Sequence, residues 1–217
     1  MTDRDTPRPR VVVLDYGSGN LRSAERALAA AGADVTVTDD LVAAADADGL
    51  VVPGVGAFAA CMAGIEALGA GPVIAGRVAA GRPVLGICVG MQILFDSGDE
   101  HGVITKGLGL LPGNVTRLPA ARLPHMGWNT VAPPVGSVLF AGLPADSRFY
   151  FVHSYAVCDS TALVAAGARV TTAHHDADFV AAVERGPLSA AQFHPEKSAD
   201  TGATLLRNWL DTVPTDG

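Results

Sequence analysis

The sequence predicts an α/β protein with an open, mostly parallel sheet, flanking helices and a β-rich second half. Short apolar runs alternate with amphipathic segments as far as Cys88, which is the pattern of strand–helix–strand units in a parallel sheet. Several of these apolar runs end in a loop that contains glycine. Helical periodicity then largely disappears between residues 98 and 195, where short strands separated by Gly, Pro and Asp turns are expected.

The first half predicts four strands and four helices in alternation. Residues 11–14 form a continuous β-branched run, which is typical of a strand that is buried on both faces. The segment 21–31 places its alanines and leucines on one side, and Gly32 follows it as a helix stop. Further strands are expected at residues 35–38, 50–52 and 83–88, and further helices at 41–47, 57–68 and 72–80.

The second half predicts short strands and one closing helix. Strands are expected at residues 114–118, 137–140, 149–153, 155–158, 163–166, 169–174, 179–184 and 188–193. The last two are expected to pair as a hairpin around Arg185 and Gly186. The helix is expected at residues 201–210. No linker or repeat interrupts this order, so one domain is predicted over residues 10–213, preceded by a polar N-terminal extension at residues 1–9.

Composition excludes several classes of protein. Of the 217 residues, 49% are hydrophobic and 17% are charged, so the chain is not intrinsically disordered. The formal charge of −7 disfavours nucleic acid and anionic membranes as partners. The N-terminus lacks a secretory signal, and no apolar run approaches the roughly 20 residues of a membrane span. Cys61, Cys88 and Cys158 are far apart, which favours a reducing compartment and no metal site. A cytoplasmic location is expected.

Residues 84–92 have the pattern of a nucleophile elbow. Cys88 ends an apolar strand between Gly86 and Gly90, and these glycines permit a sharp turn into a helix. Unpaired N–H groups in the first turn of a helix favour the thiolate form of a cysteine. The alternative is that Cys88 is a buried small hydrophobe, as free cysteines usually are.

Three glycine-containing loops are expected at one edge of the sheet, where strands end and ligands bind in such folds. They are residues 15–20, 53–56 and 86–90. The backbone N–H of Val89 and one from the 53–56 loop are candidates to stabilise an oxyanion. An ordinary strand-to-helix turn is the alternative for residues 53–56. A phosphate site at residues 17–19 is a weaker hypothesis, because the third glycine of the dinucleotide motif is missing.

A base for the thiol is expected directly after the last strand. If the extended conformation continues through Pro195, His194 and Glu196 point to the same side. Glu196 then accepts the Nδ1 proton of His194 and leaves Nε2 to face a thiol. An exposed turn is the alternative. Five other histidines lack an acid in this position at the end of a clear apolar strand: His101, His125, His153, His174 and His175.

Together these segments resemble the class I (triad) glutamine amidotransferases, and most closely the branch of glutaminase subunits that serves imidazole glycerol phosphate synthases in histidine biosynthesis. The elbow at residues 86–92 and the segment 192–198 mark the class in general. Residues 15–21, 124–129 and 150–155 mark the branch, and residues 53–58 and 107–109 also match. The resemblance implies a flavodoxin-like sheet and no cofactor.

The resemblance also implies roles for individual residues. Cys88 attacks the side-chain amide of glutamine, His194 acts as base and then as acid, and Glu196 orients His194. The remaining residues divide into an oxyanion hole (Val55, Gly56 and Val89), a glutamine-binding set (Gly54, Gln92, Ser154 and Tyr155) and a partner interface (Asn20, Met126, Trp128 and Lys197). For Lys197, an unpaired surface lysine is the alternative. The implied partner is a (β/α)₈-barrel cyclase, which uses the ammonia to form imidazole glycerol phosphate and AICAR.

Two other functions are weighed against this one. A glutaminase that serves another acceptor, such as an anthranilate or aminodeoxychorismate synthase, should lack the block at residues 124–129. A catalytically silent interaction protein has no need of Cys88, His194 and Glu196 together.

Overall fold

The apolar runs of the first half become the parallel strands of a seven-stranded sheet. The structure, a computed structural model, describes residues 8–215. The strand order is β11-β12-β13-β4-β3-β1-β2, in which β13, β4, β3, β1 and β2 are parallel and β11 and β12 antiparallel. The bounds are β1 (Arg10–Leu14), β2 (Asp34–Thr38), β3 (Gly49–Gly54), β4 (Val84–Cys88), β11 (Arg169–His175), β12 (Ala177–Arg185) and β13 (Leu188–Ala191). The prediction of an open, mostly parallel sheet is confirmed.

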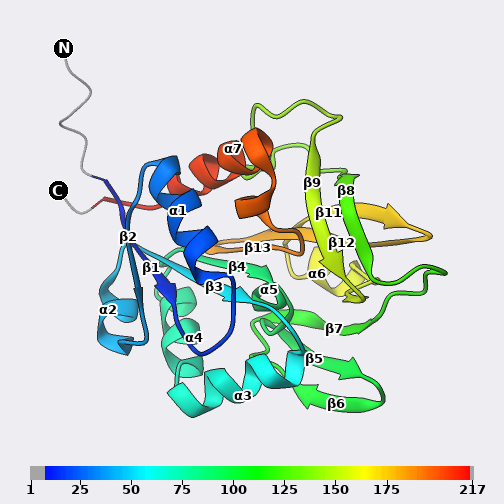
Figure 1. Ribbon diagram of the computed structural model, residues 1–217, viewed down its shortest axis with the longest axis horizontal. Helices are drawn as coiled ribbons and strands as arrows, with labels where there is room; N and C mark the ends of the chain where they lie inside the picture. Colours follow the sequence, from blue (N-terminus) through cyan, green and yellow to red (C-terminus); the bar gives the residue numbers. More distant parts are fainter. Residues whose placement is uncertain (1–7, 216–217) are drawn as a thin grey trace.

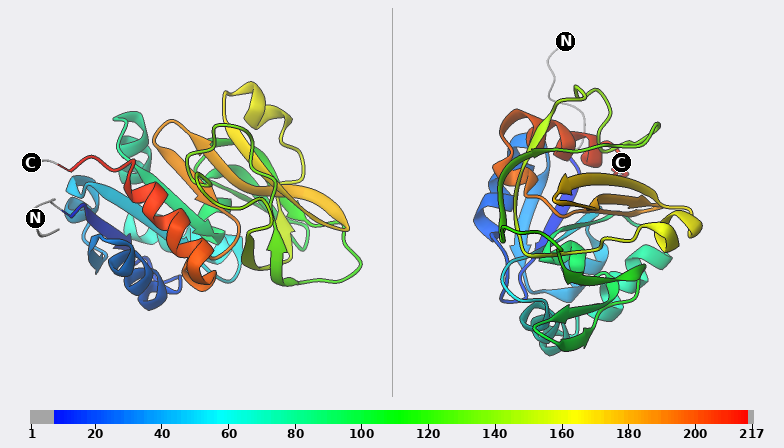
Figure 2. Two further views of the ribbon diagram at one scale, coloured as in Figure 1. Left: turned by 90° about the horizontal axis from the view of Figure 1, so that it is seen from above. Right: turned by 90° about the vertical axis from the view of Figure 1, so that its right-hand side faces the viewer.

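Helices cover both faces of this sheet (Figures 1 and 2). Helices α1 (Leu21–Ala31) and α7 (Ala199–Leu210) pack together on one face. Helices α2 (Leu41–Asp46) and α4 (Gly71–Ala79) contact each other on the other face, where α3 (Phe58–Leu68) also lies. Gly32 ends α1 with a φ of 118°, a left-handed conformation that glycine adopts without strain.

Two smaller sheets lie beyond the end toward which β3 points, on the right of Figure 1. One has the strand order β10-β7-β5-β6, with β5 (Phe95–Glu100), β6 (Val103–Lys106), β7 (Leu111–Arg117) and β10 (Tyr155–Ala156). The other is the antiparallel pair β8 (His125–Thr130) and β9 (Arg148–His153). Both place residues of the β-rich half beside the loops that follow β3 and β4.

The structure corrects several predictions for the second half. Residues 163–166 were expected to form a strand, but α6 (Thr161–Ala165) is a helix, and Asp159 accepts a hydrogen bond from its first N–H. No strand forms at residues 137–140 because the N–H groups of Val138 and Leu139 donate to the Glu184 carboxylate instead of a neighbouring strand. The expected strand at residues 155–158 is shortened to Tyr155–Ala156. Strands β5, β6 and β8 were not predicted.

The helix after Cys88 is a single short element, α5 (Val89–Gln92), before the chain turns into β5. The hairpin β12–β13 around Arg185 and the closing helix α7 are confirmed. The domain prediction for residues 10–213 stays a prediction, and residues 1–7 of the expected extension lie outside the described residues. In residues 8–215 no single helix is long and apolar enough to cross a membrane. Only α3 and α4 taken together, with an 86° bend between them, meet that length and composition.

Candidate active site

Cys88 lies at the tip of β4, at the edge of the sheet where β3 also ends. Its φ is 57°, a left-handed value that costs a non-glycine residue about 1–3 kcal/mol. The bend is possible because α5 packs directly on β3. A Cβ at Gly90 would lie 1.9 Å from the Val52 carbonyl oxygen, so this position requires glycine. The strained elbow expected from residues 84–92 is therefore present, and the Cys88 side chain is nearly buried.

His194 and Glu196 are hydrogen-bonded as expected, but the backbone between them has a different conformation from the expected one. The chain does not stay extended: Pro195–Lys197 forms a 3₁₀ turn directly after His194. That turn brings Glu196 back toward the histidine, and His194 Nδ1 lies 2.7 Å from Glu196 Oε1. The assumption of an extended segment was wrong, because Pro195 fixes only its own φ and allows a helical turn to begin there.

The backbone of His194 is held at both of its polar groups. Its N–H donates to the Tyr150 carbonyl at 2.9 Å, and its carbonyl accepts from Ser198 Oγ at 2.6 Å. The Ser198 hydroxyl in turn accepts the Tyr150 N–H. Ser198 is fully buried and was not assigned a role from the sequence. It fixes the base against β9.

The electrostatics of His194 favour its charged form. Burial lowers the pKa of His194, but hydrogen bonds to Cys88 and Glu196 and the charges of both raise it, to about 9 overall. Cys88 and Glu196 thus act on His194 in the same direction. An imidazolium between a thiol and a carboxylate can both stabilise a thiolate and return a proton to a leaving group.

A cavity of about 220 Å³ opens beside Cys88, somewhat below the roughly 300–1,000 Å³ of pockets for drug-sized ligands. It brings together most of the residues expected at the site. Its lining consists of Val55, Gly56, Cys88, Val89, Gln92, Glu100, Val152, His153, Ser154, Tyr155, His194 and Lys197. Its size suits a ligand as small as an amino acid.

The remaining expected residues do not line this cavity. Gly54 and Asn20 border a smaller cavity on the Glu196 side of His194. Met126 and Trp128 lie on β8 with 61% and 50% of their surface exposed. These last two fit a surface role better than a role in ligand binding.

Gln92 presents an acceptor to the cavity. Its Nε2 donates to the Tyr155 carbonyl and to Gln192 Oε1, both at 3.0 Å. Both protons of the amide are therefore used, and Oε1 is left to accept a hydrogen bond from a ligand. Gln192, which the sequence reasoning did not select, is buried and places its Nε2 3.9 Å from the Cys88 sulfur.

Of the oxyanion donors proposed at Val55 and Val89, only one is available, and Gly56, the third residue of the expected oxyanion hole, lines the cavity. No hydrogen bond from the Val89 N–H is found in residues 8–215. The Val55 N–H, in contrast, donates to Ser18 Oγ at 3.2 Å, and Ser18 Oγ donates to the Val55 carbonyl at 2.9 Å. The Tyr16 hydroxyl holds the same loop by donating to the Pro53 carbonyl. Val55 therefore does not supply an oxyanion donor in this conformation.

Glu100 is a further residue that the sequence reasoning missed. It lies at the end of β5, borders the cavity, and its Oε2 accepts the Phe58 N–H at 2.9 Å. It caps α3 from a distance of 42 residues in sequence. No local pattern around residue 100 indicates this position, because it depends on β5, which was itself not predicted.

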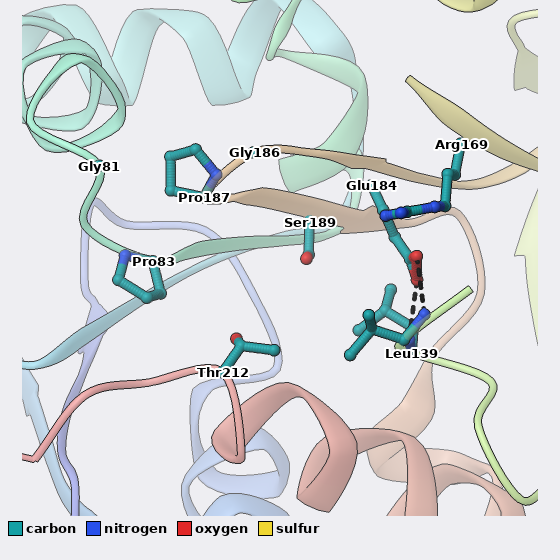
Figure 3. A pocket seen from close by; sticks show the side chains of 10 residues that line it. Gly81, Pro83, Leu139, Arg169, Glu184, Gly186, Pro187, Ser189 and Thr212 are labelled. Carbon is teal, nitrogen blue, oxygen red and sulfur yellow. Dashed lines mark hydrogen bonds between the residues drawn. The ribbon is translucent and has the colours of Figure 1, made fainter. Parts of the chain in front are cut away.

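A larger cavity of about 280 Å³ lies at the opposite edge of the sheet, where β4 and β13 begin (Figure 3). It is bordered by Pro83, Arg169, Glu184 and Ser189, among others. The Glu184 carboxylate is already occupied by the N–H groups of the 137–139 turn. Among residues 8–215, no cysteine or histidine lines this cavity, so we assign the chemistry to the cavity at Cys88. Residues 8–215 also hold no cluster of three or more His, Cys, Asp or Glu side chains suited to a metal ion.

Comparison with known proteins agrees with this geometry. The family described as "Glutamine amidotransferase class-I" matches residues 12–213. The chain is 63% identical over 210 residues to the imidazole glycerol phosphate synthase subunit HisH of Nocardia farcinica, which covers 95% of this chain and 99% of that protein. It is 59% identical over 210 residues to the HisH subunit of Thermobifida fusca, with 95% and 100% covered.

Solved structures with low sequence identity share the fold. A structure titled "Crystal structure of glutamine amidotransferase" has a TM-score of 0.73 at 22% identity and covers 94% of this chain and 98% of its own. The structure of PurLQS from Thermotoga maritima has a TM-score of 0.68 at 20% identity, with 94% and 99% covered. The chain belongs to the class-I glutamine amidotransferase family, in the branch of the HisH subunits of imidazole glycerol phosphate synthase.

Proposed function

We propose that this chain is the glutaminase subunit of an imidazole glycerol phosphate synthase. It hydrolyses glutamine to glutamate and ammonia and delivers the ammonia to a cyclase subunit in histidine biosynthesis, in the cytoplasm. The observation that carries the proposal is that Cys88 and His194 line one amino-acid-sized cavity and that Glu196 is hydrogen-bonded to His194 behind it. The identity of 59–63% to HisH subunits over nearly the whole chain supports the same reaction.

In the proposed reaction Cys88 Sγ attacks the carboxamide carbon of glutamine. The bond to nitrogen breaks as His194 Nε2 gives its proton to the leaving ammonia, and a thioester forms on Cys88. Water then adds to the thioester, with His194 accepting its proton and returning it to the sulfur, and glutamate leaves. Glu196 stabilises the imidazolium through Nδ1 at 2.7 Å.

Glutamine is held by groups on both sides of the cavity. Gln92 Oε1 accepts from a donor of the ligand, and the backbone at Ser154 and Tyr155 lines the same wall. Among the described residues that line the cavity, only Glu100 carries a carboxylate, and we assign it to the α-ammonium group of glutamine. It is already anchored by the Phe58 N–H, so its position is fixed before the ligand arrives.

The oxyanion hole is incomplete in this conformation. The Val89 N–H is available, and Val55 completes the hole when its N–H leaves Ser18 and turns to the cavity. Reorientation of the Gly54–Val55–Gly56 backbone therefore switches the site on. Gly56 has a φ of 86°, so the loop already uses the conformational freedom of glycine there.

The proposed partner is a (β/α)₈-barrel cyclase that docks on the face around the active-site mouth. Met126 and Trp128 offer exposed apolar surface there, Lys197 adds a positive charge at the rim, and Asn20 lies at the neighbouring cavity. Exposed aromatic and methionine side chains are enriched in protein interfaces. These residues form the proposed interface.

The test uses the purified chain alone and with a histidine-pathway cyclase. Glutamate release should rise when the cyclase and its ribulosyl substrate, N′-phosphoribulosylformimino-AICAR, are both present. Cys88→Ala should abolish glutamine-dependent turnover and leave the cyclase active with added ammonium. The proposal is wrong if the cyclase gives no gain in glutamate release, and the nucleophile is misassigned if Cys88→Ala keeps glutamine-dependent turnover.

A further inference from the structure

Two buried histidines of the β8–β9 hairpin are not used in the proposed reaction. His125 on β8 and His153 on β9 are 5% and 7% exposed and face each other directly in the strand register. His125 Nδ1 lies 3.0 Å from His153 Nε2. The other side of β8 carries the exposed Met126 and Trp128, so the hairpin has one face toward the proposed partner and one toward the interior.

The direction of every hydrogen bond around this pair is fixed by main-chain groups. At one end, His153 Nδ1 lies 3.0 Å from the Tyr155 carbonyl, which can only accept, so Nδ1 carries the proton. At the other end, Asn129 Nδ2 donates to the His174 carbonyl and Asn129 Oδ1 accepts the Thr130 N–H. Asn129 is therefore oriented with Nδ2 toward His125 Nε2, at 3.2 Å.

These two ends determine the state of both imidazoles. His125 Nε2 must accept from Asn129, so His125 carries its proton on Nδ1 and donates it to His153 Nε2. A second proton on either ring would point an N–H at another N–H. Both rings are therefore neutral. Burial also lowers the pKa of His125 to about 4 and that of His153 to about 3, in the same direction.

The chain of hydrogen bonds continues into the glutamine cavity. The Tyr155 carbonyl accepts hydrogen bonds from both His153 Nδ1 and Gln92 Nε2. Gln92 Nε2 also donates to Gln192 Oε1, and Gln192 Nε2 faces the Cys88 sulfur. His153 itself lines the cavity. A directional series thus runs from Asn129 on the hairpin to the Tyr155 carbonyl, where Gln92 of the glutamine wall donates from the other side.

We infer that His125 and His153 are positioning residues that hold the Tyr155 carbonyl and Gln92 for glutamine binding, through neutral imidazoles that both carry the proton on Nδ1. This inference rests on the proposed glutaminase function and deepens it. The pair links the face that carries Trp128 to the glutamine site, so it sets substrate affinity according to the position of the hairpin. His153 and His125 act through Tyr155 and Gln92 and do not touch the reacting atoms.

The kinetic test replaces the first imidazole in the complex with the cyclase. His125→Phe keeps a ring that can pack on Phe151 but removes both nitrogens, so His153 Nε2 loses its donor. We expect the KM for glutamine to rise roughly tenfold or more, with kcat within about threefold and ammonium-dependent cyclase turnover unchanged. His125→Asn restores a donor near Nδ1 and should recover most of the affinity, which a merely structural role would not require.

The matched control is His175→Phe. His175 stacks on His125 at 4.2 Å between ring centroids, but its Nε2 bonds to the Arg122 carbonyl and lies outside the series. The KM of the His175→Phe variant for glutamine should equal that of the wild type. A folded His125→Phe variant with a KM within about twofold of the wild type would overturn the inference.

A second measurement decides the matter if His125→Phe does not fold. Nitrogen-15 NMR of the histidine-labelled wild-type chain should show both rings neutral and protonated on Nδ1 at pH 7. A charged ring, or a proton on Nε2 of either, would contradict the series. This readout needs no turnover, so it is independent of the glutaminase proposal, which fails separately if the wild-type complex releases no glutamate.

Discussion

At the scale of single residues, the site depends on the positions and charges of three side chains, those of Cys88, His194 and Glu196. Cys88 is placed by a strained turn, and the backbone of His194 is held by hydrogen bonds to the Tyr150 carbonyl and the Ser198 hydroxyl. Glu196 Oε2 is buried without a partner in residues 8–215, while Oε1 holds His194. A carboxylate with a single partner in a buried site acts strongly on that partner.

The raised pKa of His194 predicts the pH profile of the reaction. With a pKa of about 9, the imidazolium is the main form at neutral pH, and it is lost as the pH rises through that value. Glutaminase activity of the complex should therefore fall above about pH 9, because the leaving ammonia loses its acid. The same shift stabilises the fold below the ordinary value of 6.5, and this contribution disappears as the pH rises through about 9.

The check is the pH dependence of kcat/KM in the wild type and in Glu196→Gln. The variant lacks the negative charge beside Nδ1, so its alkaline limb should move to lower pH, with a lower maximum rate. An alkaline limb at the same pH in both proteins would show that Glu196 does not control the pKa of His194.

The hydrogen bonds of Ser18 predict low glutaminase activity of the chain without its partner. The Ser18 hydroxyl holds both the N–H and the carbonyl of Val55, which keeps that N–H out of the cavity. Ser18→Ala should raise partner-free glutaminase activity by roughly tenfold, since two weak hydrogen bonds to Val55 no longer oppose reorientation of the loop. Ser18→Thr keeps the hydroxyl and serves as the control. Glutamate release by the isolated chain is the measurement, and equal rates in Ser18→Ala and wild type would contradict this role.

At the scale of elements, the turn after α2 is held by a buried arginine instead of by a cap of its own. Arg77 on α4 is 2% exposed and donates to the carbonyls of Ala44, Ala47 and Asp48, among others. Carbonyls at the end of a helix have no partner within it, so this guanidinium supplies what the sequence of α2 does not.

Replacing Arg77 should therefore destabilise the fold. Arg77→Met leaves several buried carbonyls unpaired, and we expect a loss of about 2–4 kcal/mol in the free energy of unfolding by urea. Arg82→Met is the matched control, because the half-buried Arg82 bonds the neighbouring carbonyls of Asp46 and Ala47 nearer the surface, and it should cost under about 1 kcal/mol. Equal losses of unfolding free energy in the two variants would mean that the burial of Arg77 does not contribute to stability.

At the scale of the whole molecule, the β-rich half surrounds the site that the parallel half presents. Strands β5 and β10 contribute Glu100 and Tyr155 to the cavity, while the hairpin β8–β9 offers Met126 and Trp128 to the outside. The proposed partner surface and the glutamine cavity therefore both draw residues from the β-rich half, on the right of Figure 1. A displacement of the hairpin reaches the cavity through His125 and His153.

Trp128 should dominate binding of the cyclase. Loss of an interface tryptophan commonly costs about 2 kcal/mol or more, so Trp128→Ala should weaken the affinity by at least roughly thirtyfold. Val42, which is 70% exposed on α2, provides the control variant Val42→Ser, with unchanged affinity expected. Calorimetric titration of the chain with the cyclase measures both, and wild-type affinity in Trp128→Ala would place the partner elsewhere.

Local sequence was sufficient for the parallel half. The β-branched runs, the glycine after α1 and the elbow at Cys88 each follow from short-range preferences, and all three were found at or within a few residues of the expected bounds. In the second half the outcome was mixed. Strand β8 contains Gly127 and Asn129, which are poor strand formers, and forms only because β9 pairs with it.

The sequence by itself therefore determined the fold class and the pairing of a thiol with a histidine and a glutamate, since these depend on local patterns and on motifs of known order. Tertiary structure alone decided three things: that Val55 donates to Ser18, that Glu100 borders the cavity, and that His125 and His153 connect Asn129 to the Tyr155 carbonyl. Each of these depends on hydrogen bonds between groups far apart in the chain. Their direction is fixed by main-chain carbonyls and N–H groups that only the folded protein brings within reach.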